Sequence, residues 1–167
     1  MKKERLFKRF VLVSAAVFAV AFWSMSAGAS EERHDKCKCP CPIPSLYERL
    51  GGLIPIAVLI DDVIERSYVD EVFKANPRIE EAHKRYPKAA YKFNSTALAC
   101  MIMGGPQKYT GRSMKDAHQH LLVNEKEWNE LKVIFRDSMN SFKVPQKEQD
   151  EILGIIESTK GDILAAH

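Results

Sequence analysis

The sequence predicts an all-α domain, and three observations support that prediction. Apolar residues recur every three or four positions through several long stretches, which is the period of one helix face. Residues that commonly cap helices stand before these stretches, and Gly or Pro follows them. No segment alternates apolar and polar residues for long enough to form a strand, and no internal repeat is visible.

The folded domain is expected to begin at Ser45. Ser45 and Glu48 form a capping-box pattern for a short helix, which Gly51-Gly52 ends. A long amphipathic helix is expected from Leu53, with Pro55 in its first turn. Its expected inward residues are Ile56, Leu59, Ile60, Val63 and Ile64, with Tyr68 one turn later.

Proline breaks at 76–77 and 86–87 divide the next stretch, and a second long helix is expected to run to Met103, where Gly104-Gly105 stops it. Its expected inward residues are Ala90, Phe93, Ala97, Cys100 and Met101. Cys100 is expected to be a buried small apolar residue and not a reactive thiol.

Two more long helices are expected near the C-terminus. Asn124 and Glu127 cap the first, and Val144-Pro145 ends it. Its expected inward residues are Trp128, Leu131, Phe135, Met139 and Phe142. The last helix is expected from about Lys147 to Ala165.

A short helix with a histidine is expected between these elements. A polar loop ends at Ser113, and from Met114 the spacing places Met114, His118, Leu121 and Leu122 on one side. His120, two residues beyond His118, points away. Because a single histidine on an apolar face is usually a hydrogen-bonded core residue, periodicity alone assigns His118 no function.

Two blocks of sequence are more specific. SLYERLGG at Ser45–Gly52 and the GGP, YTGRSM and AHQHL segments between Gly104 and Leu121 resemble the group 1 truncated haemoglobins. The resemblance covers about Ser45 to Leu164. It implies a truncated, two-over-two globin fold for residues 45–167 and haem b as cofactor, with His118 as the iron ligand.

The resemblance also implies how the two sides of the haem are built. The Nδ1–H of His118 needs an acceptor, and the carbonyl of Met114 or its neighbour, one turn upstream, is the expected one. The sixth coordination position of the iron then stays open. Dioxygen, NO or CO would bind there.

On the distal side the resemblance places Ile64 where the family usually has a tyrosine that hydrogen-bonds dioxygen. Tyr91, Ser95 and Ala99 take the positions of the second long helix over the haem, and of these Tyr91 and Ser95 can donate. Tyr68 would compensate for Ile64 if the register slips; an ordinary packing aromatic is the alternative interpretation.

Other residues are candidates for contact with the haem. The expected apolar walls are Phe93, Met101, Met114 and Leu122, which helical spacing would place in the core even without haem. Tyr109 and Arg112 lie in the loop before the short helix and are candidates for a propionate contact. A solvated loop explains these two residues equally well.

Residues 1–29 resemble a targeting segment. A basic start precedes the uncharged apolar run Phe10–Trp23, and small residues follow up to Ala29. A secretory signal peptide cleaved after Ala29 is the favoured interpretation, and an N-terminal membrane anchor through residues 10–29 is the alternative. In both cases the domain is expected outside the cytoplasm, periplasmic or exported, and in the second case it is anchored to the inner membrane.

Residues 30–44 form a tether rich in Cys and Pro. Cys37, Cys39 and Cys41 alternate with other residues near His34, and they can hold a soft metal or form disulfides. The Cys-x-x-Cys-His spacing that attaches haem covalently is absent from the sequence.

The charge balance gives no reason to expect a nucleic-acid partner. The formal net charge is +3, with 25 basic and 22 acidic residues. Five of the basic residues and one acidic residue precede the apolar run, so the remainder carries 20 against 21. No basic surface is expected on the domain.

The predicted function is therefore reversible binding of dioxygen or another diatomic gas by an exported haem protein. A haem redox enzyme is one alternative, either an NO dioxygenase supplied by an unknown electron donor or a peroxidase-like protein. A peroxidase usually has a polar acid–base pair over the iron, and neither His nor Arg is expected there. A membrane-tethered helical module without haem is the other alternative.

Overall fold

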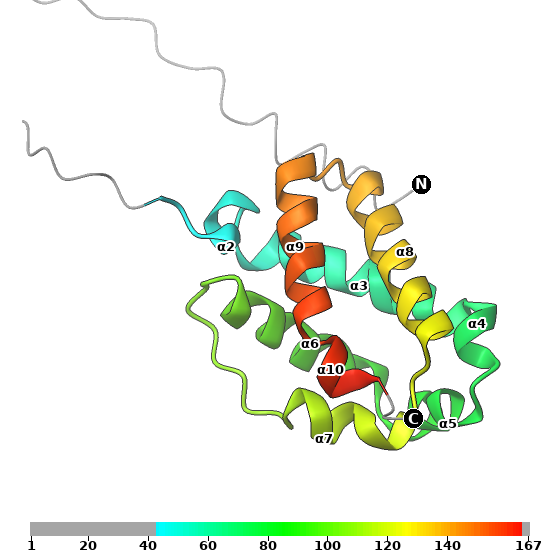
Figure 1. The fold of residues 1–167 in the computed structure, drawn as a ribbon. Coiled ribbons are helices and arrows are strands. Elements are labelled where there is room, and N and C mark those ends of the chain that lie inside the picture. The colour runs from blue at the N-terminus through cyan, green and yellow to red at the C-terminus, as the bar shows by residue number, and fades with distance from the viewer. Residues whose placement is uncertain (1–42, 165–167) are drawn as a thin grey trace, which may run out of the picture. The chain divides into compact units, whose positions relative to one another are not determined.

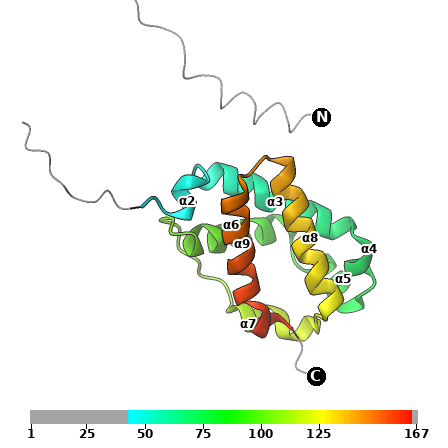
Figure 2. The same cartoon turned by 45° about the horizontal axis from the view of Figure 1, so that its top comes forward.

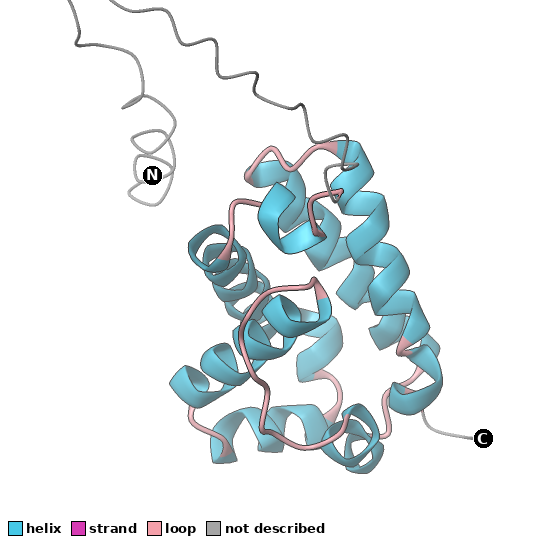
Figure 3. Ribbon diagram, turned by 90° about the vertical axis from the view of Figure 1, so that its left-hand side faces the viewer, coloured by secondary structure: helices cyan, strands magenta, loops and turns pink. Residues whose placement is uncertain are grey.

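The structure is a computed structural model that describes residues 43–164. The predicted targeting segment and most of the Cys- and Pro-rich tether, with Cys37, Cys39 and Cys41, lie outside the described residues. Within residues 43–164 the regular elements are helices, joined by loops (Figure 3). None of the helices in this range is long and apolar enough to cross a membrane.

The helices follow the order expected from the sequence (Figure 1). They are α2 (Leu46–Arg49), α3 (Leu53–Val69), α4 (Glu71–Lys74), α5 (Pro77–Arg85), α6 (Lys88–Ile102), α7 (Met114–His118), the 3₁₀ helix η1 (Gln119–Leu121), α8 (Glu125–Ser141), α9 (Gln146–Ser158) and α10 (Lys160–Ile163). The prediction of an all-α domain is confirmed.

Two pairs of long helices form the core. α3 packs against α6, and α8 packs against α9, and α3 also contacts α8, so that one pair lies over the other (Figure 2). The most deeply buried large side chains come from three of these helices: Ile56, Trp128, Met139 and Ile152. This is the two-over-two arrangement that the sequence predicts.

The two sequence blocks that carry the family resemblance meet in space. The Tyr47 backbone N–H, in α2, donates to the Met103 carbonyl at the end of α6, with an N–O distance of 2.9 Å. Gly104 has a φ of +87°, and a Cβ there would stand 3.0 Å from the Cβ of Ser45. A glycine is therefore needed at 104 for both its conformation and its close approach to α2.

The ends of the helices form largely as their capping residues predict. In α2 the Glu48 N–H donates to Ser45 Oγ at 3.2 Å, and the Ser45 N–H donates to Glu48 Oε2 at 2.8 Å. Asn124 and Glu127 form the corresponding capping box of α8. These reciprocal bonds satisfy backbone N–H groups that have no partner inside a helix.

The rotation of α6 against α3 differs from the prediction. Lys92 Nζ lies 2.5 Å from both Asp61 Oδ1 and Glu65 Oε1 of α3. Because this lysine is directed at α3, the next residue, Phe93, points away from the core and is 73% exposed. Met101 is also exposed, at 41%, whereas Cys100 is fully buried as predicted. The prediction that Phe93 and Met101 lie inward is therefore wrong.

The expected last helix is two helices. The Ser158 and Thr159 hydroxyls donate to the carbonyls of Ile155 and Ile156, and α9 ends at Ser158. Such local side-chain bonds compete with the helical hydrogen bonds of the backbone. The break lets α10 pack beside α7 (Figure 1).

Candidate functional site

The His118 imidazole has one nitrogen engaged with the backbone. Nδ1 lies 2.8 Å from the Met114 carbonyl oxygen, the acceptor expected from the sequence. Because a carbonyl oxygen only accepts, Nδ1 carries the hydrogen and donates it. In the neutral ring, Nε2 then holds the free lone pair that a metal ligand requires.

The surroundings of His118 favour this neutral ring. Burial lowers its pKa below the ordinary value of 6.5, and the neighbouring His120 acts in the same direction. The bond to Met114 opposes them, but the net direction is downward. Uncharged imidazole is the form that coordinates iron, so no proton has to be displaced at neutral pH.

Helix α7 is short because both of its ends are built locally. Ser113 Oγ accepts from the Asp116 N–H at 3.1 Å and caps the first turn. After His118 the chain tightens into η1, and Leu122 adopts a left-handed conformation with φ +51°. Met114 and Leu121 pack against the core, but the helical spacing is lost by Leu122, which is 47% exposed. The prediction that Leu122 shares the side of His118 is wrong for this reason.

The segment after His118 is tied down from two directions. Asn76 Nδ2 donates to the Leu121 carbonyl at 3.1 Å, and Arg78 Nη1 donates to the His120 carbonyl at 3.3 Å. On the other side Val123 forms an isolated parallel bridge with Leu164. The start of α5 and the end of α10 thus hold the histidine-bearing segment in place.

The predicted distal residues come from α3 and α6. Ile64 is buried at 3% exposure. Tyr91, Ser95 and Ala99 follow one another at intervals of four on α6, so they share one helix face. Tyr91 and Ala99 pack against the core, and Ser95 is half-buried. Burial raises the pKa of the Tyr91 phenol, and nearby Tyr68 adds to the shift, so this hydroxyl keeps its proton.

A contact that the sequence does not predict joins α3 to α5. The rings of Tyr68 and His83 stack at 3.8 Å between centroids and 10° between planes. Lys88 Nζ, from the start of α6, lies 4.2 Å from the centre of the Tyr68 ring. Burial, and then the Lys88 charge, lower the pKa of His83. His83 has a polar sequence context, and no local pattern indicates a partner fifteen residues away.

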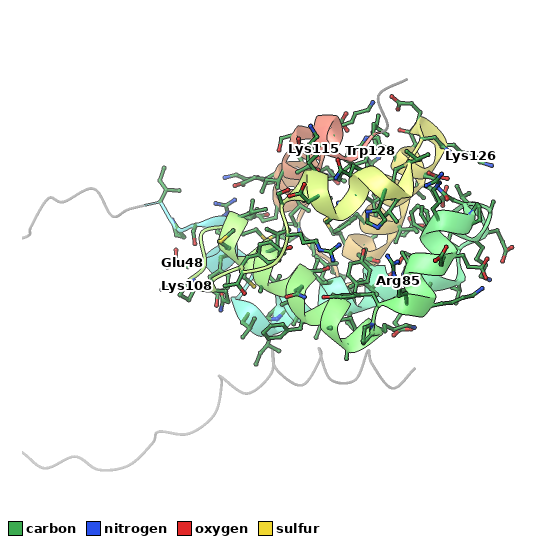
Figure 4. The ribbon with its side chains drawn as sticks, turned by 90° about the horizontal axis from the view of Figure 1, so that it is seen from below. Glu48, Arg85, Lys108, Lys115, Lys126 and Trp128 are labelled. Atoms are coloured by element: carbon green, nitrogen blue, oxygen red, sulfur yellow. The ribbon has the colours of Figure 1, made fainter. Side chains whose placement is uncertain are left out.

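The loop between α6 and α7 folds on itself. Tyr109 Oη donates to the Arg112 carbonyl at 2.8 Å, and a Cβ at Gly111 would collide with the Tyr109 ring. Figure 4 labels Lys108 in this loop and Glu48 in α2. Tyr109 is half-buried and Arg112 is exposed. Their contact with a propionate stays a prediction.

Comparison with known proteins gives this helical domain a family. Residues 45–165 match the family described as bacterial-like globin. The chain therefore belongs to the bacterial-like globins, and the curated relatives that it matches include truncated haemoglobins. The match spans the predicted globin domain and begins at Ser45, where α2 is capped.

Two curated relatives are group 1 truncated haemoglobins. The GlbN protein of Synechocystis sp. is 31% identical over 80 residues, which are 48% of this chain and 60% of that protein, less than two thirds of its length. The GlbN protein of Mycolicibacterium paratuberculosis is 28% identical over 112 residues, 67% of this chain and 78% of that protein.

Solved structures agree in fold. The Fe(III) form of truncated haemoglobin from Tetrahymena pyriformis has a TM-score of 0.65 at 21% identity, covering 74% of this chain and all of that one. The 2/2 haemoglobin of Synechococcus sp. PCC 7002, in the cyanomet state with covalently attached haem, has a TM-score of 0.63 at 23% identity. The match covers 72% of this chain and 98% of that one.

Globins hold haem, and the residues of this chain fit that cofactor. His118 has Nδ1 committed to the Met114 carbonyl, and its Nε2 lone pair is available to iron. Tyr91, Ser95 and Ala99 supply a face of α6 that is apolar at one end and carries hydroxyl donors at the other. Met114 packs against the core one turn before His118, and its contact with haem stays a prediction.

We expect Asn76→Asp to loosen the segment after His118. Aspartate keeps the oxygen that caps α5 but lacks the Nδ2–H that bonds to the Leu121 carbonyl. A lost hydrogen bond of about 1 kcal/mol should speed amide hydrogen exchange at residues 119–123 about fivefold. Asn124→Asp, the same substitution at the cap of α8, is the control. Equal exchange in Asn76→Asp and the wild type would contradict this anchoring.

We expect His83 to make the apoprotein less stable below about pH 6.5. Its pKa is lowered in the fold from the ordinary value of 6.5, so the unfolded chain takes up the proton first. The free energy of unfolding therefore decreases as the pH is lowered below 6.5, by some fraction of about 1.4 kcal/mol per pH unit. His83→Phe keeps a ring against Tyr68 and should lose less stability between pH 7 and 5 in urea titrations. Parallel profiles for the two proteins would argue against this.

Proposed function

We propose that this chain is an exported haem protein that reversibly binds a diatomic gas. The observation that supports it best is the His118 imidazole, whose Nδ1–H is bonded to the Met114 carbonyl 2.8 Å away. Membership in the bacterial-like globins supports the same cofactor and the same kind of ligand. Haem, when bound, supplies an iron with a coordination position for dioxygen, NO or CO.

The residues around His118 have separate tasks in this proposal. Met114 fixes the tautomer and the orientation of the imidazole, and the bonds from Asn76 and Arg78 hold the backbone that follows it. Phe93, Met101 and Leu122 are exposed in the structure, and their contact with haem stays a prediction. Tyr109 and Arg112 are proposed to meet a propionate from the loop.

The distal side supports gas binding over peroxidase chemistry. Ile64 is buried and has no polar atom, so it donates no hydrogen bond from the middle of α3. Hydrogen-bond donors must reach the ligand from other positions, and Tyr91 and Ser95 are the candidate donors on α6. One hydrogen bond to a partly charged ligand contributes about 1.5 to 3 kcal/mol, or roughly ten- to a hundredfold in an equilibrium constant. Neither residue is a strong acid or base at neutral pH.

The N-terminal sequence supports export. A basic start, an apolar run of about 14 residues and the small residues up to Ala29 precede the globin domain. The family match begins only at residue 45, so this leader and the tether are additions to the domain. We propose that the protein is located in the periplasm of a bacterial cell. If ferric haem must be reduced, the electron donor is also located there.

We expect purified wild-type protein, supplied with haem, to show a Soret band that shifts on reduction and again on addition of CO. His118→Ala should lose this spectrum or show altered ligation, because the single nitrogen that can bind iron from α7 is gone. His120→Ala is the matched control, since that ring is exposed and two residues away. If the wild-type protein is folded but remains colourless with haem supplied, the proposal is wrong.

We expect the full chain, produced in a bacterium, to be recovered from the periplasm with Ser30 as its first residue. Intact-mass measurement checks the N-terminus, and Ala29→Arg should block cleavage because the site requires a small residue. A membrane-bound protein with residues 1–29 still attached would support the anchor in place of the signal peptide. Protein with Met1 intact in the cytoplasm would refute export.

A further inference from the structure

Exposed cationic side chains gather on the elements around His118. Most lysines and arginines of the described chain form ion pairs, as Lys132 does with Glu157. Five cations near His118 are exposed and have no ion-pair partner within residues 43–164. They form the proximal cationic surface: Arg78 and Arg85 of α5, Lys108 of the α6–α7 loop, Lys115 of α7 and Lys126 of α8.

Packing of α5 against η1 brings two parts of this surface together. One face of α5 and the His120 ring of η1 line a groove, and the α5 residues in it are Arg78, Glu81, Ala82 and Arg85. Arg78 also donates to the His120 carbonyl at 3.3 Å. Since His120 is two residues beyond His118, the groove lies beside the segment that carries the proposed iron ligand.

The domain as a whole is not basic. Basic and acidic side chains are nearly balanced over residues 43–164, so an excess of positive charge near His118 leaves the rest of the domain acidic. A second groove, between α3, α4 and α8, shows this, because its one cation, Arg66, is paired with Asp62. Its acidic lining residues are Asp70, Glu71, Glu130 and Asp137. Contrary to the expectation from the balanced charge, the fold thus produces a basic surface.

The extent and the mixed charges of the proximal cationic surface indicate a protein partner. Its cations come from three helices and a loop, and the four that Figure 4 labels are spread over the view, so one small anion cannot contact them all. Glu81 and Asp116 lie among them. An acidic protein surface suits such mixed charges better than the uniform charge of a phosphate backbone or an anionic membrane.

We propose that the proximal cationic surface docks an acidic protein that donates one electron to the haem iron. This inference rests on the proposed function and names the class of its electron donor. One electron passes from the donor to Fe(III), which becomes Fe(II), and no bond forms or breaks. Attraction between opposite charges raises the association rate by about 10- to 1000-fold, and the gain falls as salt is added.

Two double variants with equal net charge test where the donor docks. Arg85→Gln with Lys115→Gln removes two cations of the proximal cationic surface. Arg136→Gln with Lys147→Gln removes two other exposed cations that have no ion pair within residues 43–164, from the second half of α8 and the start of α9. These two positions flank the α8–α9 turn, at the other end of the domain from α7 (Figure 1).

Reduction of the ferric haem protein is followed by stopped-flow absorbance, with a reduced, negatively charged [2Fe–2S] ferredoxin as the probe. The second-order rate constant of the wild type should fall about tenfold or more between about 0.02 M and about 0.5 M salt. At low salt the Arg85/Lys115 variant should react about tenfold more slowly than the wild type, and the Arg136/Lys147 variant within about twofold of it. Dithionite, which needs no docking, should reduce all three proteins at similar rates.

Docking is measured separately by NMR on the ferrous CO form. Addition of oxidised ferredoxin should shift the backbone amides of residues 77–85 and 108–126 and leave those of residues 136–147 unchanged. The Arg85/Lys115 variant should lose most of these shifts. Its rate of haem loss to apomyoglobin should equal that of the wild type, because the proposed role of the two cations is to contact the donor and not the haem.

The outcomes separate this inference from the function on which it rests. Equal reduction rates for the two double variants, or a rate independent of salt, would overturn the docking and leave gas binding intact. Binding to phosphatidylglycerol vesicles without amide shifts from ferredoxin would assign the surface to a membrane and overturn it too. Faster haem loss from the Arg85/Lys115 variant would assign these cations to the propionates instead. If the wild type takes up no haem, the proposed function fails and this inference with it.

Discussion

The hydrogen bond from His118 Nδ1 to the Met114 carbonyl is the interaction on which the site depends. It joins two residues one turn apart, so any distortion of α7 would change both the direction of the imidazole and the tautomer it adopts. Much of the surrounding structure serves to keep this short helix undistorted. Ser113 caps its start, Asn76 and Arg78 bind the backbone after its end, and the bridge from Val123 to Leu164 closes the other side.

On α3, the proposed haem site combines a buried aliphatic residue with a tyrosine one turn later. Ile64 is buried in the middle of α3, where its side chain adds apolar surface to the core. One turn later the buried Tyr68 hydroxyl has no hydrogen-bond partner within residues 43–164, and His83 of α5 supplies the ring that stacks on Tyr68. The same α5 begins with the residues that anchor the proximal segment. A single helix between α4 and α6 therefore touches both sides of the proposed haem site.

Local pattern accounts for a large part of the fold. The capping boxes at Ser45 and Asn124, the breaks before Pro77 and Pro87, and the burial of Cys100 follow from the sequence as predicted. The errors share a cause. Phe93 and Met101 have helical spacing with buried residues, but the Lys92 ion pairs to Asp61 and Glu65 accompany a docking of α6 that leaves them outside. Periodicity identifies the apolar face of a helix. It does not show which residues at the edge of that face the partner helix covers.

The sequence by itself determined most of the helices, their caps and the more buried position of His118 compared with His120, because each depends on residues within a few positions of one another. The acceptor for His118 belongs to the same class, since Met114 is one turn away. Tertiary structure alone decided which face of α6 is buried, that His83 covers Tyr68, and that Asn76 reaches Leu121. These contacts join residues fifteen to forty-five positions apart, and such distances in the chain leave no periodic signal; only the packing of α3, α5, α6 and α7 brings the partners together.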